Sequence, residues 1–270
     1  MNVCVSQATT LTSPFATDVA AFGDVGWGAA ELWLTKLETH LETATLDDTK
    51  RLLADAKILP VAAAYQGGLL LSQGAERAAH FDHFRRRLDL CQAIGIPTLI
   101  IAADFALRAD VMGLRRAVVS LTQAAQWAAG HGVRLALEFR GTEAICTSLD
   151  TAIGLAEECG EPNVGVCLDV FHYYKGPSKS EDLERLTRAN LAHVQICDVA
   201  GVPRELMGDA DRVLPGDGDF PFAPIWEALR RIGYEGYVSL ELMNPTLWQM
   251  KPTQVAELGL MAVRRSVEKG

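Results

Sequence analysis

The sequence lacks any excess of basic residues. Lysine and arginine number 25 against 34 aspartates and glutamates, which leaves a formal net charge of −9 at pH 7. Because nucleic acid and anionic membrane surfaces repel such a charge, neither is expected as a partner. Long apolar runs are also missing, so no membrane-spanning helix is predicted. The first residues, MNVCVSQATT, lack the basic start and apolar run of a signal peptide.

Closely paired cysteines are absent as well. The six cysteines are scattered along the chain, and no CxxC pair occurs among them. Several lie in apolar runs, where a reduced cysteine behaves as a small hydrophobic residue. We therefore expect free thiols in a reducing compartment, which predicts a cytoplasmic location.

What the sequence does contain is a regular alternation of short apolar runs with longer amphipathic stretches. Eight runs share the non-alternating apolar pattern of strands that are covered on both faces of a parallel sheet. They are residues 2–6, 29–34, 59–65, 97–104, 133–139, 164–171, 191–197 and 237–242. Amphipathic helices are predicted between them, for example over residues 110–129 and from Pro252 onward.

Eight strand–helix units without a linker or a break in composition predict one α/β domain over residues 1–270, a (β/α)8 or TIM barrel. The rival fold is an open, doubly wound sheet. That rival is weakened because no glycine-rich phosphate turn follows an early strand.

Oxygen-bearing side chains stand near the carboxyl ends of four neighbouring predicted strands, where barrels of this type carry their active sites. They are Glu138, Asp169, Gln195 and Glu241. Three carboxylates within about 4 Å of one another would repel by roughly 4 kcal/mol per pair at an effective dielectric of about 20. A divalent cation removes that cost, so the four side chains are interpreted as one metal site. This all-oxygen set favours Mn²⁺, with Mg²⁺ or Co²⁺ as alternatives, over Zn²⁺.

Several motifs over residues 133–245 resemble those of the xylose-isomerase-like sugar isomerases and epimerases. The motifs are LEF, LDVFH, HVQICD, RVLPGDGDFPF and LEL. That family includes ketose 3-epimerases, hydroxypyruvate isomerases and inosose isomerases. The resemblance implies a barrel fold, a metal-dependent activity and a set of site residues. The implied metal ligands are Glu138, Asp169, Gln195 and Glu241, and the implied substrate-binding residues are His172 and Arg212.

The chain departs from the commonest pattern of this family at Gln195, where many relatives have histidine. His193 lies two residues earlier on the same side of the predicted strand and is the rival ligand. It is otherwise a candidate for substrate binding. Trp33, in the second predicted strand, is a further candidate wall of the substrate pocket, although the favoured interpretation is a packing residue beside a buried charge pair.

A hard cation in such a site would polarise the carbonyl of a substrate that carries adjacent carbonyl and hydroxyl oxygens. Proton removal then gives a metal-bound cis-enediolate, and Glu138 and Glu241 are the expected proton-transfer bases. Return of the proton to the same carbon gives an epimer, and return to the other carbon gives an isomer. The sequence thus predicts a metal-dependent isomerase or epimerase acting on a small sugar or hydroxy-keto acid.

Three alternatives remain at the level of sequence. A dehydratase of the inosose or dehydroshikimate type could use the same site, since the same enolate can lose a β-hydroxyl group. An abasic-site endonuclease is a remote alternative, because it needs a histidine-rich zinc cluster and a basic surface. A binding protein without catalysis is the third. The sequence identifies neither the substrate nor the oligomeric state, and a homodimer or higher homo-oligomer is left open.

Overall fold

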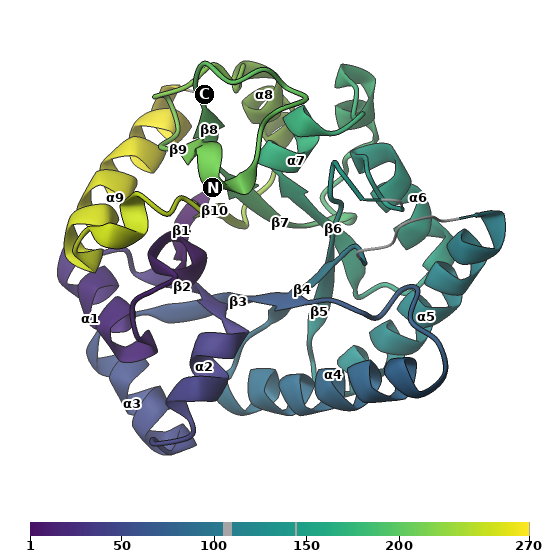
Figure 1. The fold of residues 1–270 in the computed structure, drawn as a ribbon, viewed down its shortest axis with the longest axis horizontal. Helices are drawn as coiled ribbons and strands as arrows, with labels where there is room; N and C mark the ends of the chain where they lie inside the picture. Colours follow the sequence, from purple (N-terminus) through teal and green to yellow (C-terminus); the bar gives the residue numbers. More distant parts are fainter. Residues whose placement is uncertain (105–109, 144, 270) are drawn as a thin grey trace. The chain divides into compact units, whose positions relative to one another are not determined.

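A closed barrel of eight parallel strands forms the centre of the computed structural model, which describes residues 1–104, 110–143 and 145–269 (Figure 1). The strands follow one another around the barrel in the order β1-β10-β7-β6-β5-β4-β3-β2. Their bounds are β1 Asn2–Ser6, β2 Ala29–Trp33, β3 Leu59–Gln66, β4 Thr98–Ala102, β5 Arg134–Glu138, β6 Val164–Asp169, β7 Leu191–Ile196 and β10 Tyr237–Leu240. Each predicted strand overlaps one of these, so the (β/α)8 prediction is confirmed.

Helices connect successive strands. Within the described residues they are α1 Phe15–Val25, α2 Leu34–His40, α3 Leu46–Asp55, α4 Gly74–Ile94, α5 Val111–Gly130, α6 Leu149–Cys159, α7 Val170–Lys175, α8 Ala223–Arg231 and α9 Pro252–Lys269. Side-chain caps fix some of their starts: Asp110 accepts a hydrogen bond from Gly113 N at the start of α5, at 2.7 Å. None of the described helices has the length and apolar character that crossing a membrane requires.

The chain divides by its internal contacts into two compact units. Met1–Ala63 together with Gln195–Gly270 forms the first, and Ala64–Val194 forms the second. The prediction of a single domain over residues 1–270 stays a prediction.

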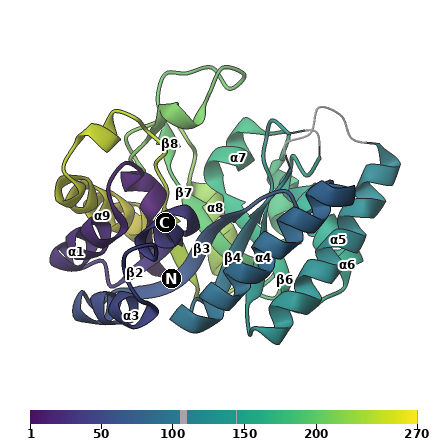
Figure 2. The same cartoon turned by 60° about the horizontal axis from the view of Figure 1, so that its bottom comes forward.

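In the first unit, β1 pairs in parallel with both β2 and β10. The register sets Ser6 beside Glu31 in the middle of β2, and Val5 beside Leu240 at the end of β10. Helix α9 packs against α1, as Figures 1 and 2 both show. The indole Nε1 of Trp27 donates to the carbonyl of Ala256 in α9 at 3.0 Å. The packing and pairing therefore hold Glu31, within β2, and Glu241, directly after β10, in fixed register with β1.

In the second unit, β5 pairs in parallel with β4 and β6. Glu138 is the last residue of β5 and pairs with Ala102 on one side and Cys167 on the other. All six residues of β6, Val164 to Asp169, are buried. This is the pattern expected of a strand covered on both faces, and it carries Asp169 to the end of the strand.

A buried ion pair ties together the segments that follow β1 and β2 in the first unit. The Lys36 ammonium group forms an ion pair with Asp18 and donates to the carbonyl oxygen of Thr10 at 2.8 Å. The side-chain amide of Gln7 joins this network, because its nitrogen donates to Asp18 at 3.4 Å and its oxygen accepts from Trp33 N at 2.9 Å. The backbone after each strand is thus held by side chains from the other segment.

Burial raises the pKa of Asp18 from 3.8 to about 6, although Lys36 and nearby hydroxyl groups oppose the rise. The folded protein therefore holds this proton to a higher pH than the unfolded chain does. Consequently the contribution of Asp18 to the free energy of unfolding falls as the pH rises from about 4 to about 6. Carbon NMR of the Asp18 carboxyl group is expected to give a midpoint near pH 6. A midpoint at or below pH 4 would contradict the burial argument.

Candidate functional site

Two carboxylates and an imidazole meet in the second unit. Glu138, Asp169 and His172 each offer one ligand atom, and these atoms lie within 4.8 Å of one another. The Nε2 atom of His172 is 3.5 Å from Glu138 Oε1 and 3.6 Å from Asp169 Oδ2. The three residues are at most 5% exposed. We call this set the Glu138 cluster.

Asp169 has a local structural role besides its place in the cluster. It is the N-cap of α7, and its Oδ1 accepts a hydrogen bond from Phe171 N at 2.8 Å. The strand therefore turns directly into a helix at this residue, and the first turn of the helix carries His172 back toward the carboxylates. One oxygen of Asp169 caps the helix while the other faces the imidazole.

A second set of buried polar groups lies in the first unit and consists of Glu31, Gln195, Arg212 and Glu241, here called the Glu241 cluster. The amide Nε2 of Gln195 donates to Glu31 Oε1 and to Glu241 Oε1, each at 3.0 Å. The Nη1 of Arg212 donates to Glu241 Oε2 at 3.2 Å. All four residues are at most 4% exposed. Each oxygen of Glu241 thus receives a hydrogen bond from a buried donor.

Thr9, which the sequence analysis did not single out, fixes the backbone on both sides of Glu241. Its Oγ1 donates to the carbonyl of Leu240 at 3.0 Å and accepts from Leu242 N at 3.1 Å. Thr9 is fully buried. Its position on the turn after β1 gives no sequence signal of this role, because the partners lie more than 230 residues away.

Arg212 is held by Asp209 as well as by Glu241. The Nη2 of Arg212 donates to Asp209 Oδ1 at 2.7 Å, and its Nε donates to the same oxygen at 3.0 Å. This side chain was expected to bind substrate. The structure shows it buried, with its Nη1 bonded to Glu241.

The loop at residues 214–222, which follows Arg212, is fastened to one buried carboxylate. Asp198 accepts hydrogen bonds from Gly216 N, Gly218 N and Phe220 N, at 3.0, 3.1 and 3.0 Å. A Cβ atom at Gly218 would lie 2.4 Å from Asp198 Oδ1, so glycine is needed for this close approach. Asp198 begins a two-residue strand, β8 (Asp198–Val199), that pairs with β9 (Arg212–Val213).

The other two predicted site residues, Trp33 and His193, belong to neither cluster. Trp33 is half-buried and lines a cavity of about 480 Å³ with Thr12, Lys36 and His40, among other residues. His193 is 3% exposed within β7. Neither position decides between a packing role and a substrate-binding role, and both assignments stay predictions.

The donor set of the Glu138 cluster fits a divalent cation. Ligand oxygens and nitrogens bind such ions at about 2.0–2.6 Å, so atoms within 4.8 Å of one another need only small movements to share one ion. The His172 Nδ1 is buried and makes no hydrogen bond among the described residues. Burial raises the pKa of the Cys146 thiol, and the charge of the Glu138 carboxylate raises it further. That thiol stays neutral and adds no charge to the cluster.

The description "xylose isomerase-like TIM barrel" belongs to a family model that matches residues 19–265. The chain belongs to this family. It is 28% identical over 260 residues to an inosose isomerase of Halalkalibacterium halodurans, covering 93% of this chain and 90% of that protein. It is 30% identical over 141 residues to a D-psicose 3-epimerase of Enterocloster bolteae, covering 51% of this chain and 43% of the epimerase.

Among solved structures, an IolI protein with a bound zinc atom has the same fold. It superimposes with a TM-score of 0.95 at 24% identity and covers 100% of this chain and 99% of its own. The sequence-based assignment to the xylose-isomerase-like isomerases and epimerases is therefore confirmed at the level of the family.

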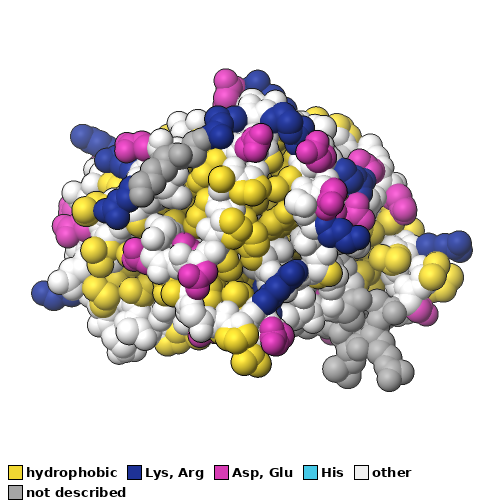
Figure 3. Space-filling model, turned by 90° about the horizontal axis from the view of Figure 1, so that it is seen from above, with side chains coloured by type: hydrophobic (Ala, Val, Ile, Leu, Met, Phe, Trp, Pro, Cys, Tyr) yellow, Lys and Arg dark blue, Asp and Glu magenta, His cyan; other side chains and the backbone are white. Residues whose placement is uncertain are grey.

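The distribution of surface charge bears on whether nucleic acid is a partner. On the face drawn in Figure 3, acidic and basic side chains lie close to one another, with apolar side chains between them. A nucleic-acid-binding surface instead gathers its lysines and arginines on one face. The expectation that nucleic acid is not a partner stays a prediction.

Replacing Thr9 tests how Glu241 is held. Thr9→Val removes the hydroxyl group and leaves the amide of Leu242 buried without its acceptor, so we expect a loss of about 1–3 kcal/mol in the free energy of unfolding. Thr9→Ser retains the hydroxyl group and is expected to lose less. Urea denaturation of both variants measures the difference, and equal losses would show that the hydroxyl group does not hold this backbone.

Proposed function

We propose that the protein is a divalent-metal-dependent isomerase or epimerase that acts on a small carbohydrate-like substrate. The observation that carries the proposal is the Glu138 cluster, in which two buried carboxylates and a histidine lie within 4.8 Å of one another. Burying such carboxylates together is costly unless a cation compensates them. The inosose isomerase and D-psicose 3-epimerase relatives support the class of reaction.

The proposed ligands of the cation are those that the sequence resemblance implies, namely Glu138, Asp169, Gln195 and Glu241. In a (β/α)8 barrel, functional side chains come from the carboxyl ends of several strands, which supports a shared ion for these four. Because the amide nitrogen of Gln195 donates to Glu31 and Glu241, its oxygen is the atom proposed to face the cation. The hard donor set favours Mn²⁺, with Mg²⁺ and Co²⁺ as alternatives.

When bound, the cation would supply Lewis-acid polarisation of a substrate carbonyl group. Glu138 and Glu241 are proposed to remove a proton from the carbon next to that carbonyl and to return it. His172 is proposed to donate a hydrogen bond to a substrate oxygen. Arg212 holds one oxygen of Glu241 and is proposed to stabilise negative charge that develops on the substrate. Return of the proton to the same carbon or to its neighbour distinguishes an epimerase from an isomerase.

Dehydration is the second candidate, because it begins with the same proton removal. A substrate that carries a β-hydroxyl group could lose it as water instead of regaining the proton. The proposed residues serve both reactions up to that step. Product analysis therefore has to accompany any measurement of proton exchange.

We expect the Mn²⁺-loaded protein to exchange one carbon-bound proton of its substrate with solvent. Incubation in D₂O with a panel of ketoses, inososes and hydroxypyruvate, followed by proton NMR, detects the exchange and shows whether an epimer, an isomer or a dehydrated product accumulates. Glu241→Gln should reduce the exchange at least about a hundredfold, since a general base contributes about 10²–10⁴-fold. Undiminished exchange in that variant would rule out Glu241 as a base.

Metal binding is tested without reference to activity. In isothermal titration with Mn²⁺, Mg²⁺, Co²⁺ and Zn²⁺, we expect one tight site in the wild type and an affinity at least about tenfold lower in Glu138→Gln and Asp169→Asn. Zn²⁺ is included because the fold neighbour contains it. The matched control is Glu181→Gln, since Glu181 is an exposed carboxylate of the same unit. Equal affinities in all four proteins would place the ion elsewhere.

A further inference from the structure

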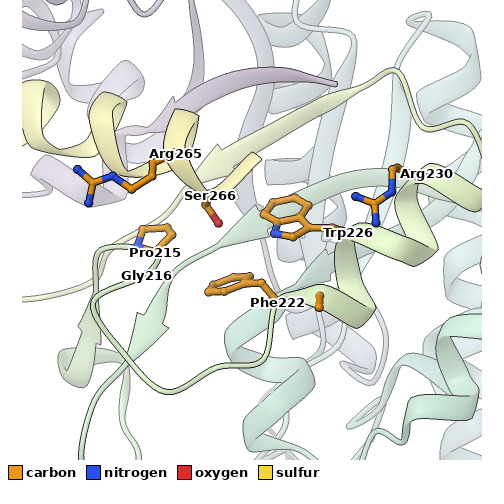
Figure 4. A pocket seen from close by; sticks show the side chains of 8 residues that line it. Pro215, Gly216, Phe222, Trp226, Arg230, Arg265 and Ser266 are labelled. Carbon is orange, nitrogen blue, oxygen red and sulfur yellow. The ribbon is translucent and has the colours of Figure 1, made fainter. Parts of the chain in front are cut away.

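A cavity of about 270 Å³ lies in the first unit between the 214–222 loop and the helices α8 and α9 (Figure 4). Its lining residues are Pro215, Gly216, Phe222, Ala223, Trp226, Arg230, Arg265 and Ser266. None of these residues belongs to the Glu138 cluster or the Glu241 cluster. The volume is near the lower end of the range for ligand-binding pockets, which suits a small ligand.

The polar groups that line the cavity are hydrogen-bond donors. Figure 4 shows the guanidinium group of Arg230 directed toward Trp226, and the Ser266 hydroxyl group directed into the space between the rings and Pro215. Arg265 is an exposed side chain at the opposite edge, and its guanidinium group is directed away from the rings and Ser266. No lining residue is acidic, although the chain carries a net charge of −9. Such a set of donors suits a ligand that carries an anionic acceptor group.

These donors are not committed to partners in the protein. Among the residues that the structure describes, Arg230 and Arg265 form no ion pair, and the hydroxyl group of Ser266 forms no hydrogen bond. The indole N–H of Trp226 likewise has no acceptor in the described chain, although Trp226 is only 2% exposed. The indole nitrogen is not among the buried side-chain atoms that lack a partner, so it is accessible to solvent and therefore to a ligand.

The floor of the cavity is aromatic. The rings of Phe222 and Trp226 stack with their centroids 5.9 Å apart and an interplanar angle of 18°. Flat apolar surface of this kind suits a ring or another compact apolar body. The cavity therefore combines a surface for a ring with donors for a negative charge.

We propose that this cavity is a binding site for a small organic anion, a carboxylate or a phosphate ester, whose ring lies against Trp226 and Phe222. Arg230 binds the anionic group, Arg265 joins it after its exposed side chain turns inward from the direction that Figure 4 shows, and Ser266 and the indole N–H of Trp226 donate hydrogen bonds to it. The site also adjoins the backbone that carries Arg212, because Pro215 and Gly216 line the cavity and Gly216 N is fastened to Asp198. An occupant can thus influence the loop next to the Glu241 cluster.

The test uses the full chain and follows the indole N–H signal of Trp226 by NMR, assigned with Trp226→Phe. The probes are benzoate and phenyl phosphate, with inorganic phosphate and benzyl alcohol as controls that lack the ring and the charge. We expect the signal to shift with benzoate or phenyl phosphate at concentrations at which both controls leave it unchanged. The tighter of the two probes identifies the anionic group.

Substitution of each arginine tests whether that side chain binds the anionic group. Arg230→Gln and Arg265→Gln are each expected to raise the dissociation constant about two- to fivefold, the range of exposed charge pairs. The matched control Arg264→Gln, next to Arg265 on α9 but outside the lining, should leave it unchanged. The proposal is overturned if neither aromatic anion moves the signal, or if Arg264→Gln weakens binding as much as the other two. None of these readouts depends on the proposed isomerase activity.

Discussion

Negative charge buried at the ends of apolar strands is the constraint on which the site depends. Glu138 ends β5 and Asp169 ends β6, and both residues are at most 5% exposed. A desolvated carboxylate is costly unless hydrogen bonds or a positive charge compensate it. Part of the compensation for Asp169 is the amide of Phe171, and His172 faces both carboxylates. A divalent cation is the group that compensates such a pair most completely.

In the Glu241 cluster, the buried carboxylates are instead compensated by hydrogen-bond donors of the protein. Gln195 bonds to two carboxylates at once, and Arg212 bonds to the second oxygen of Glu241. Side chains from other segments fix the backbone around them. Thr9 forms hydrogen bonds with the backbone on both sides of Glu241, and Asp198 accepts hydrogen bonds from the loop that follows Arg212. The side chains of this unit that are proposed to act in the site are therefore oriented by a second layer of hydrogen bonds.

The sequence predicted the barrel because each strand is an apolar run and the helices between them are amphipathic. It also predicted that Glu138 and Asp169, two of the four expected ligands, lie near strand ends, since the apolar runs indicate where strands stop. The direction of the Gln195 amide could not be predicted, because it depends on Glu31, 164 residues away. Strands β8 and β9 were missed because two residues carry no periodic pattern. Thr9 was missed because its partners lie more than 230 residues away and are set by the fold.

The central claim is that Glu138 and Asp169 bind one divalent cation. Crystals grown with Mn²⁺ and measured at the manganese absorption edge test it most directly, since the anomalous signal locates the ion without reference to activity. The account predicts one strong peak at bonding distance from a carboxylate oxygen of Glu138 and of Asp169. A manganese peak bound elsewhere, or a cluster that stays free of manganese at saturating concentration, would contradict it.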